Sequence, residues 1–202
     1  MKTWVKVLLV TLAVLVLLGI ILVSRVIGVN NKIVTLDMAV KSAWGQVQNV
    51  YQRRADLIPN LVETVKGYAV HEKGTFEEVT QARAKLGGVV NIPPDAVNNP
   101  EIMKKYREAQ ASLGAALQRL MVVSENYPQL KANENFLSLQ AQLEGTENRI
   151  TVERRGYNEA VREYNTYISI FPNSIVAGFK RAKNAEFYEA DPVAQTAPKV
   201  KF

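Results

Sequence analysis

An apolar stripe that continues past a proline is the feature of this chain that most constrains its fold. Apolar and aromatic residues recur at steps of four and three on both sides of Pro59, and Arg54 fills the one slot that would otherwise be skipped. A proline inside a helix removes one N–H donor and crowds the preceding turn, so it usually ends or bends the helix. Because the spacing keeps its phase, we expect one kinked helix here rather than two. The stripe comprises Val40, Trp44, Val47, Tyr51, Ile58, Leu61, Val65 and Tyr68.

A polar string surrounds the kink, and we call it the kink motif: Arg53, Arg54, Asp56, Pro59 and Asn60. Asp56 and Asn60 are four residues apart and so share one helix face. Pro59 leaves the carbonyl oxygen four residues earlier without its helical donor, and a side chain or a water must replace that donor. The motif is therefore either a docking site that uses the kink or a structural joint whose polar groups repair the helix.

The N-terminal region contains an uncharged apolar run from residue 7 to residue 23, interrupted only by Thr11 and Gly19. A run of this length is at the short end for a membrane-spanning helix. The residues that follow it show no small-x-small cleavage pattern, so we expect a retained single-pass anchor rather than a cleaved signal sequence. Positive charges nearly balance across the run, and we expect the amino terminus inside and the main domain outside the cytoplasm.

Three long helices are expected after the anchor. A joint at residues 28–31 precedes a first helix over about residues 32–86, with a restart at Thr75 as the alternative, because Thr75 and Glu78 match a capping box. A second helix runs from Pro100 to about residue 127 and a third from about residue 133 to 170. The expected fold class is all-α, with an N-terminal transmembrane helix followed by a long antiparallel three- to four-helix bundle of coiled-coil character. The expected boundaries are 1–30 for the anchor and joint, 31–184 for the bundle and 185–202 for a loosely ordered C-terminal tail.

The lengths of these helices predict self-association. At 1.5 Å per residue the first helix would be about 80 Å long, and the two returning helices are too short to cover all of it. Part of its stripe would then lack a partner within the chain, and exposed apolar stripes usually meet another surface. We expect a second copy of the chain to cover this self-association stripe, unless a sharp bend at Pro59 folds it back. Its residues are Val40, Trp44, Val47 and Tyr51.

The third helix carries a heptad seam with a polar middle. Apolar or aromatic residues repeat at intervals of seven, which predicts a coiled-coil interface. Polar groups in a seam lower stability and can fix register and partner choice, while plain surface charge and a carboxylate-based active site are the alternatives. The repeating residues are Phe136, Leu143, Ile150, Tyr157 and Tyr164, and the polar residues of the seam region are Glu147, Arg149, Glu153 and Arg154.

A short apolar and basic segment follows the third helix. Ile175 and Phe179 stand beside the cations Lys180, Arg181 and Lys183. Such a combination can lie on an anionic membrane. The alternative is a short element that packs on the end of the bundle.

Composition excludes several classes of site. The chain has no cysteine, so thiol chemistry and zinc–thiolate sites are absent, and it has one histidine, His71. A catalytic triad or a His-rich metal centre is therefore hard to build in one subunit. The net charge of +6 is spread among acids rather than clustered, which does not favour a nucleic-acid partner. We expect no catalytic residues, no metal and no cofactor.

The chain resembles the LemA family of bacterial membrane proteins. The resemblance implies a single-pass anchor followed by a bundle of long helices, relatives among magnetosome membrane proteins, a place in the bacterial inner membrane and no established enzymatic activity. It rests on residues 53–68, 71–72, 82–84, 127–136 and 142–150, on the Tyr-Asn pairs at 157–158 and 164–165, and on Phe171-Pro172.

Two functions remain open at this point. The first is a membrane-anchored, self-associating helical scaffold that organises or shapes the bacterial envelope membrane. The second is an adaptor or regulator of a membrane protease or signalling complex, which docks a membrane-protein partner through the kink motif or the tail. The expected partners are the lipid bilayer, further copies of the chain and a membrane protein.

Overall fold

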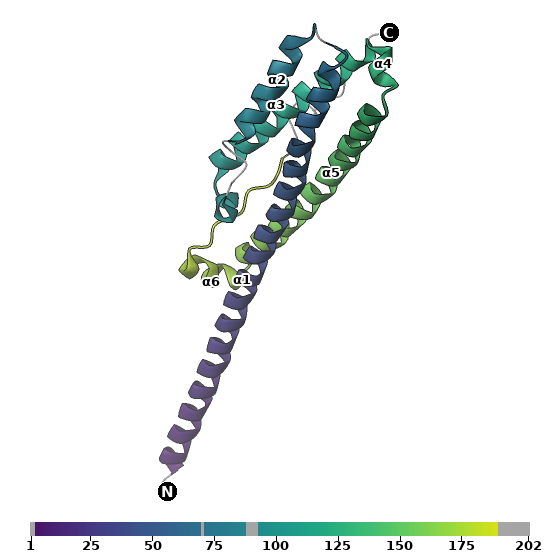
Figure 1. Ribbon diagram of the computed structural model, residues 1–202. Coiled ribbons are helices and arrows are strands. Elements are labelled where there is room, and N and C mark those ends of the chain that lie inside the picture. The colour runs from purple at the N-terminus through teal and green to yellow at the C-terminus, as the bar shows by residue number, and fades with distance from the viewer. Residues whose placement is uncertain (1–2, 70, 88–92, 190–202) are drawn as a thin grey trace, which may run out of the picture.

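A single helix runs the whole length of the molecule. The computed structural model describes residues 3–69, 71–87 and 93–189, in which no strand occurs. Helix α1 alone accounts for 64 residues, and the other elements pack against its second half (Figure 1). The elements are α1 (Thr3–Lys66), α2 (Lys73–Gly87), the 3-10 helix η1 (Pro94–Asn98), α3 (Pro100–Glu125), α4 (Pro128–Lys131), α5 (Glu134–Ser169) and α6 (Asn173–Lys180).

The bundle is antiparallel, as the sequence predicts. The chain rises along α1, returns along α2, rises again along α3, turns over α4 and descends along α5, whose end leads into α6 at the base (Figure 1). Helix α5 packs along α1, and α2 packs on α3. The all-α fold class and the antiparallel bundle are thereby confirmed.

Capping residues set the starts of α3 and α5. The Asn99 side chain accepts hydrogen bonds from the N–H groups of Glu101 and Ile102 at 3.1 and 3.3 Å, directly before Pro100 begins α3. The Asn133 side chain accepts one from the N–H of Phe136 at 3.0 Å and begins α5. These caps satisfy donors that the first turn of a helix leaves open.

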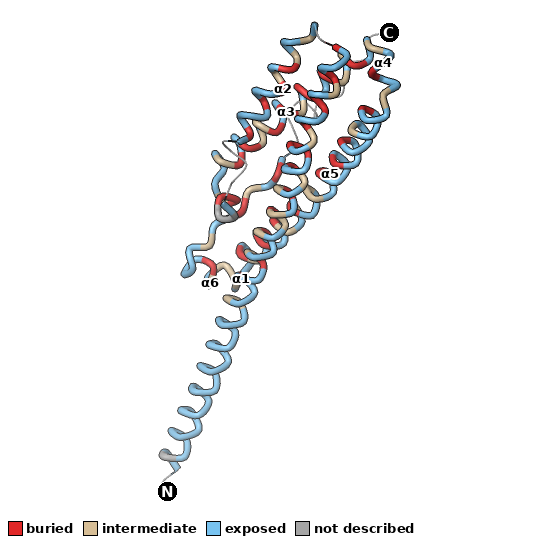
Figure 2. The backbone as a smooth tube through the Cα atoms, viewed as in Figure 1, coloured by how far each residue is buried: buried red, intermediate tan, exposed pale blue. Residues whose placement is uncertain are grey.

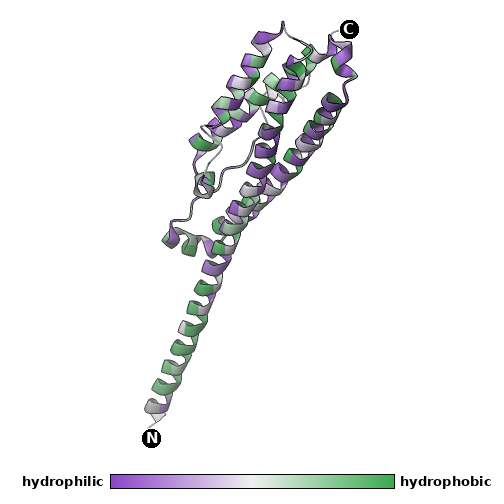
Figure 3. Ribbon diagram, in the orientation of Figure 1, coloured by the Kyte–Doolittle hydropathy of each residue, from purple (hydrophilic) through white to green (hydrophobic). Residues whose placement is uncertain are grey.

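The N-terminal part of α1 stands outside the bundle. All residues from 6 to 28 are exposed (Figure 2), and most of them are hydrophobic (Figure 3). In the described chain this is the one segment long and apolar enough to cross a membrane, with a mean hydropathy of 3.1 in its most apolar window. Burial begins at Val29 and Asn30 without a break in the helix, so the joint predicted at residues 28–31 is wrong.

The prediction of one helix through Pro59 is confirmed, but that helix ends earlier than predicted. Helix α1 contains Pro59 in its interior and stops at Lys66, directly before Gly67. A second helix, α2, starts at Lys73, two residues before the alternative restart at Thr75. Glycine is among the weakest helix formers, which accounts for the break that the stripe alone does not reveal.

Two apolar clusters form the core, one above the other along α1. The proximal core, nearer the N-terminal rod, consists of Ile33, Leu36, Val40, Trp44, Val47, Tyr51, Ala96, Val97, Met103, Tyr106, Ile150, Tyr157, Val161, Tyr164, Ile168, Ala177, Ala185 and Tyr188. The distal core consists of Ile58, Leu61, Val62, Val65, Ala69, Phe76, Val79, Ala82, Leu86, Leu113, Ala116, Leu117, Leu120, Leu130, Phe136 and Leu143. Every residue of the predicted heptad seam lies in one of the two, so that prediction is confirmed.

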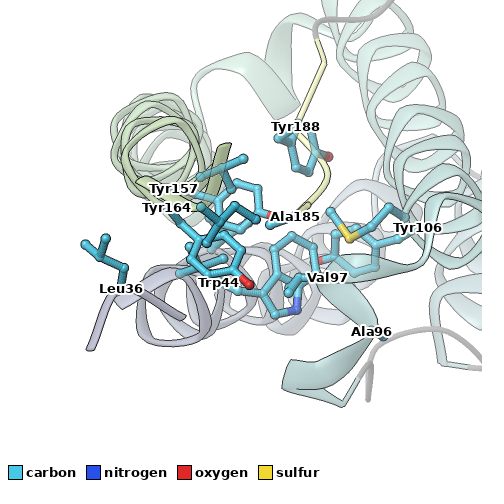
Figure 4. Packing of buried hydrophobic residues seen from close by; sticks show 14 of the residues in the cluster. Leu36, Trp44, Ala96, Val97, Tyr106, Tyr157, Tyr164, Ala185 and Tyr188 are labelled. Atoms are coloured by element: carbon cyan, nitrogen blue, oxygen red, sulfur yellow. The ribbon is translucent and has the colours of Figure 1, made fainter. Parts of the chain in front are cut away.

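The self-association stripe is buried within the single chain, which contradicts the prediction that it lacks an internal partner. None of its four residues is more than 4% exposed. Trp44 lies between Tyr106 and Tyr157, with ring centroids 5.1 and 5.3 Å away (Figure 4). The length argument fails because α1 ends at Lys66, so its bundled part is about 57 Å long and the 36-residue α5, at about 54 Å, matches it.

The segment after α6 is extended and packed, not loosely ordered, as far as residue 189. Ala185 and Tyr188 are buried in the proximal core, and the N–H of Glu186 donates to the carbonyl oxygen of Val97 at 2.9 Å. We call residues 182–189 the extended segment. The rest of the predicted tail, 190–202, lies outside the described residues.

Candidate docking cleft

A polar layer separates the two cores. Arg54 of α1 lies between Tyr51 of the proximal core and Ile58 of the distal core. Gln110 of α3 likewise lies at the boundary between the two cores. Both are buried, Arg54 at 5% exposure. Glu147 of α5 completes the layer from the third helix. The core is therefore interrupted by charge at one level, where three helices meet.

The Arg54 guanidinium is held by three hydrogen bonds. It donates to Oε2 of Glu147 at 3.0 Å, to Oε1 of Gln110 at 2.7 Å and to the carbonyl oxygen of Gln110 at 3.2 Å. Its carbon also lies 5.0 Å from the centre of the Tyr51 ring, within range for a cation–π contact. A buried charge needs such partners, because desolvation without them is costly. The arginine that fills the skipped slot of the stripe thus joins α1, α3 and α5.

Two asparagines of α5 bind the backbone of the extended segment. Asn165 donates to the carbonyl oxygen of Ala185 and accepts from the Ala185 N–H, both at 2.9 Å. Asn158 pairs with Tyr188 in the same way, at 2.9 and 2.7 Å. The two asparagines are seven residues apart and so lie on one face of α5. This face binds an extended peptide through its main chain.

The extended segment ends against a hydroxyl pair. The hydroxyl oxygens of Tyr51 and Tyr188 are 2.7 Å apart. Burial raises the pKa of both phenols above the usual value, which keeps them neutral and available as hydrogen-bond partners. Arg154 stacks over the Tyr188 ring at 4.2 Å and donates to the carbonyl oxygen of Glu189 at 3.2 Å.

A cleft of about 700 Å³ lies beside the end of the extended segment, because Tyr188 and Glu189 are among its lining residues. Its lining combines Arg54 and Glu147 with the end of the extended segment and with the small α3 residues Ala111, Gly114 and Ala115. The lining residues are Tyr51, Arg54, Lys104, Arg107, Glu108, Gln110, Ala111, Gly114, Ala115, Gln118, Glu147, Arg154, Tyr188 and Glu189.

The cations at the rim of the cleft are loosely paired. Lys104 lies 3.9 Å from a carboxylate oxygen of Glu108, and Arg107 lies 3.8 Å from one of Glu189. Both distances exceed hydrogen-bond length. The exposed Lys104 pair contributes little stability, so Lys104 can change partners at small cost. The half-buried Arg107 also donates to the carbonyl oxygen of Phe187 at 3.0 Å, so it stays beside the extended segment when its carboxylate partner changes.

The structure separates the members of the kink motif. Arg54 alone lines the cleft, whereas Arg53, Asp56, Pro59 and Asn60 are exposed and do not. Asp56 accepts a hydrogen bond from Gln52 at 2.7 Å, along the same helix. Of the motif, therefore, only Arg54 belongs to the cleft.

The repair of the helix at Pro59 comes from another helix. The Arg83 side chain of α2 donates through Nε to the carbonyl oxygen of Ala55, at 3.3 Å. Ala55 is the residue whose carbonyl loses its donor to Pro59. The interpretation of this position as a structural joint is therefore supported by the Arg83 hydrogen bond, which comes from outside the kink motif.

The polar seam residues and the basic segment divide in a similar way. Glu147 and Arg154 line the cleft, but Arg149 is exposed and Glu153 half-buried, and neither does. Ile175, Phe179, Lys180, Arg181 and Lys183 lie in and just after α6, at the base of the bundle and away from the cleft (Figure 1).

Sequence reasoning missed Gln110, Tyr188 and the two asparagines of α5. A signal for the asparagines was present, because the Tyr-Asn pairs at 157–158 and 164–165 repeat at the heptad interval. In each pair the tyrosine enters the proximal core and the asparagine turns to the extended segment. Within the described ranges, no group of three or more His, Asp or Glu residues gathers to hold a metal ion.

Comparison with known proteins places these features in a family context. The model of the LemA family matches residues 43–202. Two magnetosome proteins of Paramagnetospirillum magneticum, MamQ 2 and MamQ 1, are each 25% identical to the chain over 185 residues, covering 82% of it and 66% of their own length. Protein LemA of Metamycoplasma hominis is 24% identical over 167 residues, covering 83% of the chain and 72% of the relative. The chain thus spans slightly less than two thirds of the magnetosome relatives.

Proposed function

The chain belongs to the LemA family, and we propose that this membrane-associated helical protein is a docking adaptor whose cleft receives an extended segment of a membrane-protein partner. One observation carries the proposal. The face of α5 already holds one extended segment by its backbone, and a cleft of about 700 Å³ adjoins the end of that segment at Tyr188 and Glu189.

The position of the cleft suits a partner in the same membrane. About 20 residues cross the hydrocarbon layer, so a span that begins at Val7 ends near Val26. Arg54 then lies about 40 Å further along α1. The cleft is thereby presented at a fixed height above the bilayer, on a helix that continues directly from the anchor.

The chemistry of the lining favours a segment that carries a carboxylate. Four cations and three carboxylates line the cleft, and the rim cations Lys104 and Arg107 are the ones with long pairs. A carboxylate of the partner can replace Glu108 or Glu189 as their counterion. The terminal nitrogens of the buried Arg54 are already bonded to Gln110 and Glu147, and this residue serves to shape the site. The proposed role includes no catalysis.

The proposal is tested by crosslinking in native membranes with the full-length protein. A photoreactive benzoylphenylalanine at the exposed position Gln118, in the cleft, should crosslink to one defined segment of a partner, whereas the same group at Val152, exposed on α5 outside the cleft, should not. The segment is then made as a synthetic peptide, and its Kd for the purified full-length protein is measured at low and high salt.

A matched pair of variants decides whether that binding occurs in the cleft. Gly114 and Gly145 are helical glycines at which an added Cβ would meet no neighbouring atom within 4 Å, but only Gly114 lines the cleft. Gly114→Leu should weaken peptide binding about tenfold or more, because it fills the space, and Gly145→Leu should leave the Kd unchanged. A crosslink from position 118 to residues 190–202 of the same chain, or equal Kd values for both variants, would refute the proposal.

We also infer that the bundle lies on the extracytoplasmic side of a bacterial inner membrane, which follows from the expected orientation of the anchor. A cysteine introduced at the exposed Val122 should react with a membrane-impermeant maleimide in intact spheroplasts. Reaction only after the cells are lysed would reverse this orientation.

An organising or shaping role at the envelope membrane is the second candidate. Burial of the self-association stripe removes the argument for a scaffold built through those residues. The membrane-organising role is instead favoured by the exposed apolar side chains in α6 and in the turn before it, where the bundle meets the anchor.

A further inference from the structure

Large apolar side chains are concentrated at the base of the bundle. Ile170 and Phe171 precede α6, and Ile175 and Phe179 lie four residues apart within it, on one helix face. Phe171 is 81% exposed and Phe179 87%, the two highest values among the exposed large hydrophobic residues of the described chain. Isolated apolar residues on a surface need no explanation, but four within ten residues do.

The opposite side of α6 fixes its place. Ala177 is buried in the proximal core, Val176 packs against that core, and α6 contacts α1 directly. Nζ of Lys180 lies 3.3 Å from Oδ1 of Asn30 on α1. The exposed face of α6 is therefore held at the level of Asn30 and is not carried on a loose linker.

That level coincides with the surface of the bilayer. A span of about 20 residues from Val7 ends near Val26, so Asn30 lies about 6 Å beyond the hydrocarbon layer. The headgroup layer on each side is about 5–8 Å thick. Helix α6 lies across the base of the bundle at this point, with the anchor continuing below it (Figure 1).

The charges around α6 match an anionic surface. No acidic residue occurs between Glu163 and Glu186, whereas Lys180, Arg181 and Lys183 are all exposed. The neighbouring Glu163 is paired with Lys32 of α1 at 3.7 Å. Exposed aromatic and aliphatic side chains beside cations are the composition of helices that lie in a membrane interface.

We propose that α6 and the turn before it dock into the headgroup layer of a bilayer that contains anionic lipid, as a second membrane contact beside the α1 anchor. Phe171, Ile175 and Phe179 enter the boundary between headgroups and acyl chains, and Lys180 and Lys183 bind lipid phosphates. Because α6 lies to one side of the α1 anchor, the two contacts together restrict the tilt of the bundle on the membrane. This proposal does not depend on the cleft or its partner.

The chain has no cysteine, so a single introduced thiol reports one position. The full-length protein with Phe179→Cys carries an environment-sensitive nitrobenzoxadiazole label and is reconstituted in nanodiscs of phosphatidylcholine and phosphatidylglycerol. Spin-labelled lipids with the nitroxide near the headgroup should quench this label. The same label at Val122→Cys, exposed near the far end of α3, is the control and should not be quenched.

The proposed binding of lipid phosphates by the two lysines is tested in the same assay. Lys180→Gln with Lys183→Gln should reduce the ratio of inserted to water-exposed label about fivefold per removed cation, and nanodiscs of phosphatidylcholine alone should do the same. Arg181 is left unchanged because its backbone is left-handed, with φ of 53°. The matched control replaces the exposed Lys73 and Lys131 at the far end of the bundle.

Three results would overturn the proposal. Equal quenching at positions 179 and 122 would show that α6 does not meet lipid. A label at 179 that is shielded from aqueous iodide but not quenched by lipid would assign the face to a protein partner or a second copy. If insertion does not change when phosphatidylglycerol is left out or when both lysines are replaced, binding of anionic lipid is refuted.

Discussion

Replacing the buried arginine of the polar layer is the sharpest test of how the bundle is held together. In Arg54→Met the side chain keeps most of its volume but loses three hydrogen bonds. The bond to Glu147 contributes at most about 1 kcal/mol, because that carboxylate is 57% exposed and water replaces the guanidinium. Gln110 is buried and loses the donor to its amide oxygen, which costs about 1–3 kcal/mol. We expect a total loss of about 2–3 kcal/mol.

A double-mutant cycle separates this pair from general damage to the core. Gln110→Met should cost about as much as Arg54→Met, since it removes the side-chain acceptor of the buried guanidinium. The double variant should be less destabilised than the sum of the two single variants by about 2 kcal/mol, because the lost bond is counted once. Apolar replacement of a whole buried polar group is often nearly neutral.

The free energies come from urea unfolding of the full-length protein in detergent micelles, followed by far-ultraviolet circular dichroism. The free energy of unfolding must fall with urea concentration at the same slope in all variants for the comparison to hold. Arg155→Met, at an exposed position one residue beyond Arg154, is the control and should not change stability. Additive costs in the double variant would refute the argument that Arg54 and Gln110 form one unit between the two cores.

Three further predictions concern single contacts. Burial raises the pKa of Tyr188 above its ordinary 10.0, so the phenol loses its proton less readily in the folded chain than in the unfolded chain. Its contribution to the free energy of unfolding is therefore intact below pH 10, and stability should fall as the pH rises above that value. Tyr188→Phe should flatten this fall when unfolding is measured as a function of pH. Asn158→Ala removes both backbone bonds to residue 188, and hydrogen exchange at that amide should accelerate, whereas the exposed Asn148→Ala should leave it unchanged. Arg83→Ala should cost about 1 kcal/mol in thermal unfolding but nothing in a Pro59→Ala background, where the helix regains its own donor; an equal cost in both backgrounds would contradict the repair.

Much of the fold was predictable because helices are local structures. The heptad repeat of α5, the start of α3 at Pro100 and the phase of the stripe across Pro59 each depend on residues within a few turns of one another. The end of α1 at Lys66 was missed, since a stripe can stay in phase across a short break. That one error lengthened the first helix and produced the wrong inference about Trp44.

The candidate site was only partly predictable. The sequence singled out Arg54, Glu147 and Arg154 as polar residues in apolar patterns, and all three line the cleft. It did not pair Arg54 with Glu147, which is 93 residues away, or with Gln110 on a third helix. Such partners are fixed by the order in which helices pack, and no local spacing records that order.

Local sequence is enough to establish that this chain is a set of long helices behind an apolar run of membrane-spanning length, because periodicity and hydropathy are properties of neighbouring residues. It does not establish what covers Trp44, that residues 182–189 bind along α5, or that α6 lies at the level where the anchor ends, and the packed structure was needed for all three. The cause is distance along the chain. Each of these contacts joins segments separated by at least one whole helix, and only packing brings them together.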